Sequence, residues 1–309
     1  MRAIAIILIA LVITPMAGAN YETGEESWRS VEVDTTQWTD GPDLEGSPMD
    51  YPKPGDAVLA IDVEYKPSHL GSQVQGQIVI ELFEKWAPNT TSNMIKNVEE
   101  GIYNGIFFHR VIDDFVTQAG DPTCKAVGIY PATSVTCGGG GTGTTIALEH
   151  NENLSHVDGA IGMARGQDPD SADSQWYIAE TEAHGLDPEN REDEGYATFG
   201  IVRNGMSHVR AIATVPTTDD PSGEEIVVNP ASSAGRPIWE VHISNVEMIG
   251  VIPLQDDISN PSTKSFFSTV AGKATISIAS VVILVLGYLA YDRSKKEEPD
   301  AILLDLDDG

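Results

Sequence analysis

The chain has 309 residues and a formal net charge of −29, from 47 acidic and 18 basic side chains. So large an acidic excess argues against a nucleic-acid partner, which needs a basic surface, and it disfavours adhesion to anionic lipid. An acidic surface of this kind keeps a protein soluble, also in a salty medium. The length is that of one or two domains.

Each end of the chain carries an apolar segment. Residues 1–19 have the pattern of a secretory signal peptide, in which Arg2 precedes an apolar run and small residues follow at the cleavage position. An uncleaved anchor is the alternative, because the run is only slightly shorter than a membrane span. Residues 273–291 predict a single helix through the cell membrane, followed by a short acidic tail at 292–309. Basic residues directly after this helix place the tail in the cytoplasm, so the part of the chain before the helix is expected to lie outside.

Between these ends we expect one folded domain at 56–250, with an acidic extracytoplasmic leader at 20–55 and a juxtamembrane linker at 251–272. The leader has no sustained periodicity, which predicts an extended tether. In the domain, start and stop residues predict a helix at 88–100, and a second, short helix is expected at 206–213. Alternating or β-branched runs predict strands at 57–65, 76–83, 146–149, 159–164, 174–179, 197–202 and 237–249. Many short strands with two helices and long loops favour a mainly β fold, a closed antiparallel barrel.

The two cysteines, Cys124 and Cys137, lie in one glycine-rich loop of the domain. Outside the cytoplasm, oxidising conditions favour a local disulfide, which would stabilise the fold by about 3 kcal/mol by restricting the unfolded chain. A metal site is the weaker alternative, because these cysteines do not have the spacing of a zinc site. We identify no other metal site in the sequence.

The stretch 107–121 carries the most informative pattern. It begins as an aromatic and β-branched run typical of a half-buried strand and holds Arg110 among apolar neighbours. Because arginine is rarely buried without a partner, Arg110 is ion-paired, extends to water, or awaits an acceptor on a ligand. His109 falls on the opposite face of the strand, where core packing is the favoured interpretation. His150 and His156 fit no closed metal site, and we expect them to be solvated.

Three motifs follow one another along the domain. They are Phe108-His109-Arg110-Val111-Ile112 with Phe115 to Asp121, Gly162-Met163-Ala164-Arg165 with Ser174 to Ile178, and Leu186-Asp187 with Tyr196 to Gly200. In order and spacing this set resembles the cyclophilins, the family of peptidyl-prolyl cis-trans isomerases, in particular bacterial and archaeal members. The resemblance covers residues 56–250 and excludes both flanks. It implies an eight-stranded antiparallel barrel capped by two helices, with the active groove on its outer face.

The resemblance also implies roles for single residues. Arg110 matches the catalytic arginine, and Gln118 matches a groove amide that we group with it as catalytic. The other matches are substrate-binding positions of the groove: Phe115, Val116, Ala164, Arg165, Gln175, Tyr177, Leu186 and Tyr196. Tyr177 stands at the floor of the proline pocket, where the family usually has phenylalanine, and its added hydroxyl can narrow that pocket.

The chemistry of this family asks for the same residue types. Rotation about an X-Pro bond has a barrier of roughly 18–20 kcal/mol, because amide resonance is broken. It needs no nucleophile, metal or cofactor, but it needs an apolar pocket for the proline ring and a donor that favours the twisted amide. We therefore expect a monomeric, cofactor-free isomerase that acts on proline-containing polypeptides outside the cytoplasm. The alternative is a membrane-tethered proline-binding or holdase module with little turnover, which the joint presence of Arg110, Phe115, Gln118 and Gln175 disfavours.

Overall fold

The structure, a computed structural model, describes residues 27–44, 46–125, 137–218 and 235–254. The predicted signal peptide, membrane helix and acidic tail lie outside the described residues. Among the residues that are described, no helix combines the length and the apolar character that a membrane crossing needs.

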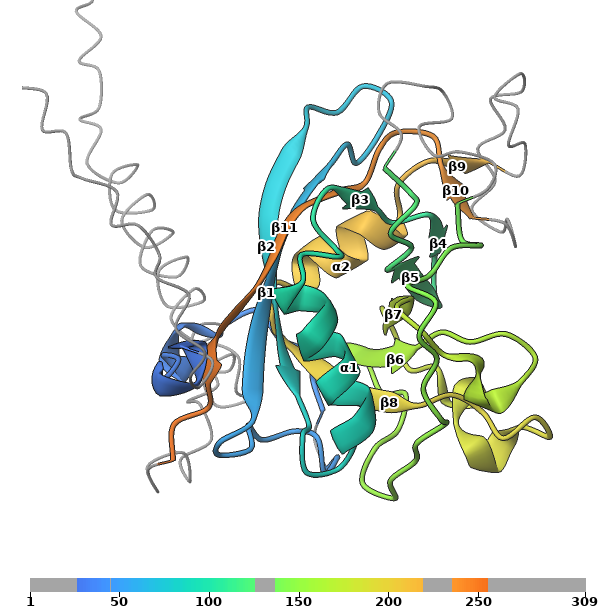
Figure 1. The fold of residues 1–309 in the computed structure, drawn as a ribbon. Helices are drawn as coiled ribbons and strands as arrows, with labels where there is room; N and C mark the ends of the chain where they lie inside the picture. Colours follow the sequence, from blue (N-terminus) through green and yellow to red (C-terminus); the bar gives the residue numbers. More distant parts are fainter. Residues whose placement is uncertain (1–26, 45, 126–136, 219–234, 255–309) are drawn as a thin grey trace, which may run out of the picture.

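The domain is mainly β, as predicted, and its principal sheet is antiparallel and curls around an apolar interior (Figure 1). The sheet has nine strands in the order β3-β11-β1-β2-β8-β6-β7-β5-β4. Their bounds are β1 Ala57–Tyr65, β2 Val74–Leu82, β3 Ile106–Phe107, β4 Arg110–Ile112, β5 Val116–Ala119, β6 Ala160–Met163, β7 Trp176–Ala179, β8 Thr198–Asn204 and β11 His242–Val251. A separate two-stranded ladder joins β9 (Thr217–Thr218) to β10 (Arg236–Pro237).

The closed eight-stranded barrel expected from the sequence is not the arrangement of the described strands, which form a curled half-barrel. Its two edge strands, β3 and β4, do not pair with each other, and only Phe108 and His109 separate them in the chain. The chain changes partner within this dipeptide. The Phe108 N–H donates to the carbonyl of Val241 next to β11, whereas the His109 N–H donates to the carbonyl of Gln118 in β5. The two edge strands of the curled sheet are therefore connected by the chain itself, through Phe108 and His109, and not by hydrogen bonds between β3 and β4.

Both predicted helices are confirmed, α1 at Pro88–Glu99 and α2 at Met206–Ala213. In Figure 1 they lie between strands β1, β2 and β11 on one side and strands β4 to β8 on the other. Each buries an apolar stripe in the main core, with residues such as Met94 and Val98 from α1 and Val209 and Ile212 from α2. Short 3-10 turns occur at η1 Ser27–Ser30, η2 Thr35–Gln37, η3 Pro169–Ser171, η4 His184–Leu186 and η5 Pro188–Asn190.

Most strand predictions are confirmed to within a few residues, with two exceptions. Residues 146–149 form only an isolated bridge between Ile146 and Ala172 and not a strand. The last strand begins at His242 and not at Pro237, because Pro237 belongs to the separate β9-β10 ladder.

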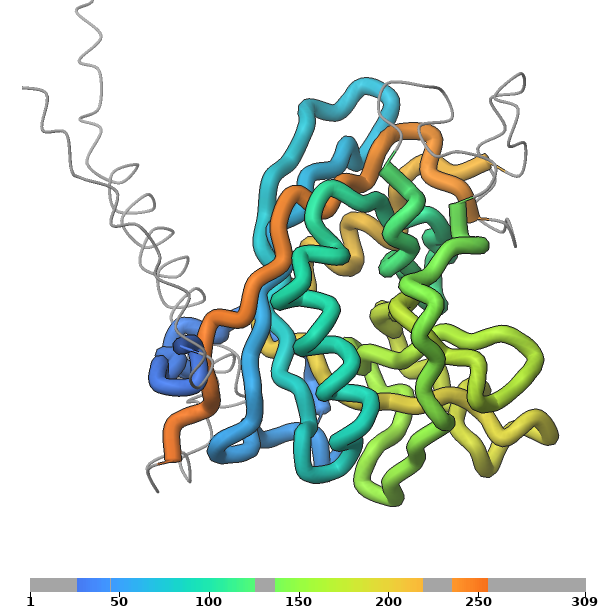
Figure 2. The backbone as a smooth tube through the Cα atoms, viewed as in Figure 1, coloured from blue at the N-terminus to red at the C-terminus, as the bar shows by residue number. Residues whose placement is uncertain are grey.

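The described part of the leader, residues 27–44 and 46–55, is packed on the domain, which corrects the expectation of an extended tether. Val33 donates its N–H to the carbonyl of Val251 at 3.0 Å, and the N–H of Val251 donates to the carbonyl of Val31 at 2.9 Å. Figures 1 and 2 show this start of the described chain beside the end of β11. Val33, Leu44 and Met49 are buried. Single apolar residues without periodicity carry no local signal, so their burial depends on partners far along the chain.

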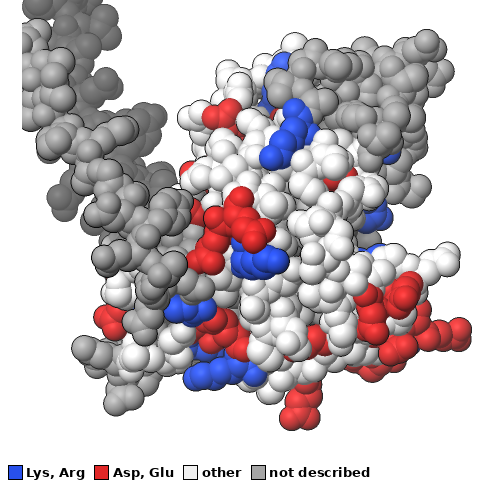
Figure 3. Space-filling model, in the orientation of Figure 1, with Lys and Arg blue, Asp and Glu red and all other residues white. Residues whose placement is uncertain are grey.

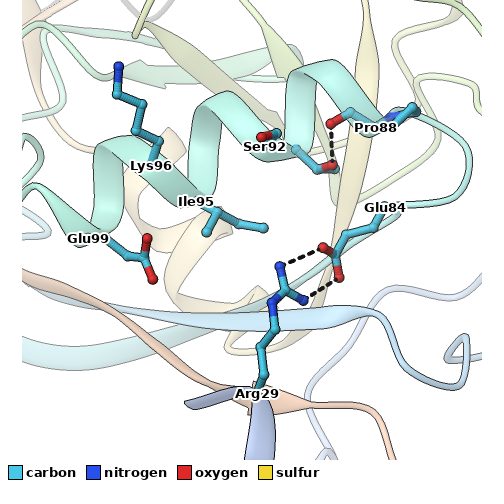
Figure 4. Close-up of a pocket in the computed structure, with 8 residues that line it drawn as sticks. Arg29, Glu84, Pro88, Ser92, Ile95, Lys96 and Glu99 are labelled. Atoms are coloured by element: carbon cyan, nitrogen blue, oxygen red, sulfur yellow. Dashed lines mark hydrogen bonds and ion pairs between the residues drawn. The ribbon is translucent and has the colours of Figure 1, made fainter. Parts of the chain in front are cut away.

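Polar contacts also fix the leader. The carboxylate of Asp40 accepts hydrogen bonds from the N–H of Ser207, at 3.1 Å, and from its hydroxyl, at 2.6 Å. Asp40 thereby caps α2, whose own N-cap residue, Gly205, has no side chain to do so. At α1, Arg29 donates to both carboxylate oxygens of Glu84 at 3.3 and 3.0 Å. Figure 4 shows this pair facing a hollow that one side of α1 lines.

One ion pair is buried beneath residues 46–55. The guanidinium Nε of Arg203 in β8 donates to Oε2 of Glu81 in β2, and the two side chains are 6% and 0% exposed. Nη1 of Arg203 donates to the carbonyl of Asp50 at 2.8 Å, and the N–H of Lys53 donates to Glu81 Oε1 at 2.6 Å. The pair therefore holds the leader against the sheet as well as joining two strands.

Candidate active site

The predicted site begins as one row of residues across five strands. Gln118 of β5 lies opposite Arg110 of β4 on one side and opposite Tyr177 of β7 on the other. Gly162 of β6 lies opposite Tyr177 and, one strand further, opposite Thr198 of β8. Residues that face one another across strands project from the same face of a sheet. The row therefore brings together on one face residues that are up to 88 positions apart, Arg110 to Thr198.

This face is the outer one. The chain neighbours of Tyr177, Trp176 and Ile178, belong to the main core inside the curl, whereas Tyr177 belongs to a second apolar cluster. That cluster contains the predicted apolar groove residues together: Phe115, Val116, Ala164, Tyr177, Leu186 and Tyr196. The rings of Tyr177 and Tyr196 stand nearly perpendicular, with centroids 6.2 Å apart and an interplanar angle of 83°. This pair forms the aromatic part of the predicted groove.

The polar groove residues form a chain of amides. Nη1 of Arg110 donates to Oε1 of Gln118 at 3.4 Å, and Nε2 of Gln118 donates to Oε1 of Gln175 at 3.0 Å. Nε2 of Gln175 in turn donates to the carbonyls of Gly138, at 3.0 Å, and Gly140, at 2.8 Å. Each amide is oriented by its neighbour. The Gln118 oxygen is therefore a fixed acceptor that orients the guanidinium of Arg110.

The side chain of Arg110 is partly buried, and its charge is not balanced by a carboxylate among the described residues. Burial lowers the pKa of its guanidinium, but arginine stays protonated in proteins. Among the described residues it makes no ion pair with a carboxylate, and a neutral amide is its hydrogen-bond partner. Of the three possibilities that the sequence left open, the structure thus favours a cation that awaits an acceptor. The remaining guanidinium N–H groups are available to a ligand in the groove.

The disulfide Cys124–Cys137 is present, as expected, with Cα atoms 5.1 Å apart. The chain after Cys137 is tied down by Asp121, whose carboxylate accepts the N–H groups of Gly138 at 2.7 Å and Gly140 at 2.9 Å. Burial alone would raise the pKa of Asp121, but these hydrogen bonds and those from Thr123 outweigh it and lower the pKa. The disulfide and this carboxylate together present the two carbonyls that hold Gln175.

Arg165, predicted to bind substrate, follows β6 and is turned to the protein. Its guanidinium donates to the carbonyls of Asp193 and Gly195 and lies over the ring of Tyr196, with Cζ 4.6 Å from the centroid. Its side chain is only 2% exposed. Arg165 therefore shapes the pocket by holding Tyr196. The surrounding loops are acidic, and Figure 3 shows acidic side chains gathered on this side of the molecule; the exposed ones include Asp168, Asp170, Glu192, Asp193 and Glu194.

The histidines divide as follows. His109 is buried, as predicted, and burial lowers the pKa of its imidazole to about 4, so it is neutral. His150 is exposed, and its Nε2 lies 2.6 Å from the carbonyl of Glu194. The expectation that His156 is solvated is wrong, because its side chain is 0% exposed and lies against Tyr177. Sequence reasoning missed His156 and its partner Asp187 because they are 31 positions apart and meet only in the folded chain.

Three comparisons with known proteins show what this chain is similar to. Residues 69–233 match the family model described as "Cyclophilin type peptidyl-prolyl cis-trans isomerase/CLD". The chain is 37% identical over 145 residues to a peptidyl-prolyl cis-trans isomerase of Acinetobacter baylyi, covering 46% of this chain and 70% of that protein. It is 34% identical over 144 residues to peptidyl-prolyl cis-trans isomerase B of Escherichia coli, covering 46% and 81%. A cyclophilin-type isomerase structure from Cryptosporidium parvum is similar with a TM-score of 0.46 at 21% identity, covering 62% of this chain and 97% of that one.

Proposed function

The chain belongs to the family of cyclophilin-type peptidyl-prolyl cis-trans isomerases and is an enzyme of that class, and we propose that Arg110 catalyses the rotation on exported polypeptides. One observation carries this proposal. The guanidinium of Arg110 is half-buried, has no carboxylate partner among the described residues, and lies in one cross-strand row with Gln118 and Tyr177.

Catalysis of this rotation is a matter of differential binding. Uncatalysed X-Pro isomerisation takes tens to hundreds of seconds, because the amide must lose its resonance in the twisted state. In that state the prolyl nitrogen becomes pyramidal and gains a lone pair, which a hydrogen-bond donor can stabilise. A donor that binds the twisted amide better than either planar form lowers the barrier. An acceleration of ~10⁵-fold requires roughly 7 kcal/mol of such stabilisation.

The site divides this task between its two halves. The proline ring occupies the apolar pocket between Tyr177 and Tyr196, and Arg110 donates to the prolyl nitrogen as the amide twists. Gln118 orients the guanidinium, and Gln175 orients Gln118. Because these donors are aligned before substrate arrives, little reorganisation is needed at the moment of reaction.

The test compares variants of the full chain on an Ala-Pro peptide. Arg110→Ala should lower kcat/KM by about 10²-fold or more, the usual loss when one transition-state donor is removed. Arg110→Lys keeps the charge but loses the planar fork and should remain strongly impaired. Lys96→Ala is the control, because Lys96 lies on α1, pairs with Glu100 at 4.0 Å and has a side chain that is 58% exposed. A wild-type chain that binds the peptide without accelerating its isomerisation would identify a proline-binding module instead.

The setting of the enzyme is a further part of the proposal. The enzyme acts outside the cytoplasm, exported by residues 1–19 and anchored in the cell membrane by residues 273–291. The disulfide supports an oxidising compartment, and the apolar length of 273–291 supports a span. Alkaline extraction of membranes should leave the chain in the pellet, and protease added to the outer side should remove the domain. Release of the chain by alkali would contradict the anchor.

A further inference from the structure

Behind the floor of the proline pocket lies a buried polar chain that the isomerisation chemistry does not itself require. Oη of Tyr177 lies 2.7 Å from Nε2 of His156, and Nδ1 of His156 lies 2.6 Å from Oδ1 of Asp187. The side chains of His156 and Asp187 are 0% and 2% exposed, and Tyr177 is 4% exposed. A chain of three polar side chains at this depth has to be satisfied internally.

Further contacts fix both ends of this chain. The N–H of His156 donates to Oδ1 of Asp187 at 2.8 Å, and the hydroxyl of Ser155 donates to Oδ2 at 2.6 Å. Nδ1 of His184 lies 2.9 Å from the same Oδ2. At the other end, the hydroxyl end of Tyr177 lies flat across β6, where an added Cβ at Gly162 would overlap its Cζ and Oη. Only glycine leaves room there for the longer ring.

The proton positions follow from the partners. Burial would raise the pKa of Asp187, but hydrogen bonds from His156, Ser155 and His184 outweigh it and hold the pKa well below its usual range. Asp187 is therefore a pure acceptor, so Nδ1 of His156 carries a hydrogen. Burial raises the pKa of Tyr177 well above its usual value, so its hydroxyl keeps its proton. In the tautomer that carries this hydrogen on Nδ1, Nε2 accepts the hydrogen of the Tyr177 hydroxyl, 2.7 Å away.

Resting on the isomerase function proposed above, we propose that His156 is a positioning residue of the proline pocket: held by Asp187, it binds the Tyr177 hydroxyl and fixes the Tyr177 ring as the pocket floor. The hydrogen bond from Tyr177 to His156 also explains how tyrosine is accommodated at a position where the family usually has phenylalanine. The hydroxyl does not narrow the pocket, because it is directed across Gly162 of β6 to Nε2 of His156. The floor that the substrate meets is then the apolar part of the ring.

Loss of this anchor has a physical consequence for the pocket. A buried hydroxyl without a partner is costly, and the side chain can relieve that cost by rotating toward water or toward the amide of Gln118. Either movement turns the ring into the space intended for the proline ring. A purely structural role for His156 would lower stability but would leave the pocket of the folded fraction unchanged.

Two amide variants separate the two contacts of the imidazole. The amide group of Gln reaches the position of Nε2 and can present its oxygen there as an acceptor for the Tyr177 hydroxyl, whereas the amide nitrogen of Asn reaches the position of Nδ1 as a donor to Asp187. His156→Gln should therefore keep a partner for Tyr177, and His156→Asn should keep only the link to Asp187. We expect His156→Asn to lower kcat/KM for an Ala-Pro peptide about tenfold, the scale of a changed pocket contact, and His156→Gln to retain most of the activity. Thermal unfolding and near-UV circular dichroism of each full-chain variant confirm that the measured fraction is folded.

The background of Tyr177→Phe gives the decisive comparison. Without the hydroxyl there is nothing to anchor, so adding His156→Asn to Tyr177→Phe should change kcat/KM by less than about twofold. A slowly exchanging Tyr177 hydroxyl proton should appear in the NMR spectrum of the wild type and of His156→Gln, and not of His156→Asn. An equal loss of kcat/KM in both backgrounds, or no loss in either, would overturn the proposal. Failure of the proposed function is recognised separately, as a wild type without turnover; peptide affinity measured on the same four variants then tests the pocket.

Discussion

Replacing Arg203 by methionine removes one half of the buried ion pair beneath the leader while keeping the aliphatic stem of the side chain. Glu81 then keeps one hydrogen bond, from the N–H of Lys53, and its side chain is 0% exposed. The carbonyl of Asp50 loses its donor as well. Breaking a buried pair on one side costs about 3–5 kcal/mol, because an uncompensated charge stays behind. Against a total stability of about 5–15 kcal/mol this is a large loss.

The loss should depend on pH in a defined direction. Burial already raises the pKa of Glu81 above its ordinary value, and the charge of Arg203 is the main effect that lowers it. Without Arg203 the pKa rises further. A carboxyl whose pKa is higher in the folded state than in the unfolded state destabilises the fold increasingly as pH rises from its unfolded pKa through its folded pKa. The deficit of the variant relative to the wild type should therefore be smallest at acidic pH, where Glu81 is protonated in both folded proteins, and should grow as pH rises.

Urea unfolding at a series of pH values measures this deficit, with the slope on denaturant checked for constancy. The double variant Arg203→Met, Glu81→Leu is the control, since it leaves no buried charge and should recover most of the lost free energy. The folded fraction should keep its isomerase activity, because neither residue lines the groove. A deficit under about 1 kcal/mol at pH 7, or one independent of pH, or a double variant no more stable than the single one, would refute the reasoning.

Two more predictions concern other charges and the disulfide. Burial and the neighbouring carboxylates of Glu81 and Glu84 raise the pKa of Asp56 to about 8. The Asp56→Asn variant should therefore become increasingly more stable than the wild type as pH rises from about 4 to about 8. A stability difference in urea unfolding that does not change with pH would contradict this. Replacing Cys124 and Cys137 together by serine should lower the free energy of unfolding in urea by about 3 kcal/mol. It should also lower kcat/KM in the folded fraction, since the chain after Cys137 holds Gln175. Unchanged kinetics would show that the hydrogen bonds of Asp121 suffice to hold this chain in place.

Much of the fold was predictable because its signals are local. The alternation in 57–65 identifies a strand, and the apolar spacing of 88–100 identifies a helix. The candidate groove residues were identified for another reason, since their order along the chain resembles that of a known family. The row Arg110-Gln118-Tyr177 then shows why that order works: pairing between strands turns fixed separations in sequence into neighbours on one face.

Other features depend on contacts that no local pattern reports. The leader looks like a tether because its apolar residues are isolated, yet Val33, Leu44 and Met49 pack against apolar residues of the domain. The partner change between Phe108 and His109 has no sequence signature, because both residues suit a strand equally well. Residues 146–149 have the composition of a strand but find only one bridge.

The sequence by itself determined the alternating and helical periodicities, the pairing of two cysteines and, through the resemblance to a known family, which residues are candidates for the groove. The tertiary structure alone determined the environment of each of these residues: a free charge on Arg110, an aligned amide behind it, and His156 buried beneath Tyr177. The physical reason is that residue type sets what a side chain can donate or accept. Its burial and its partners arise from segments that fold together from distant parts of the chain.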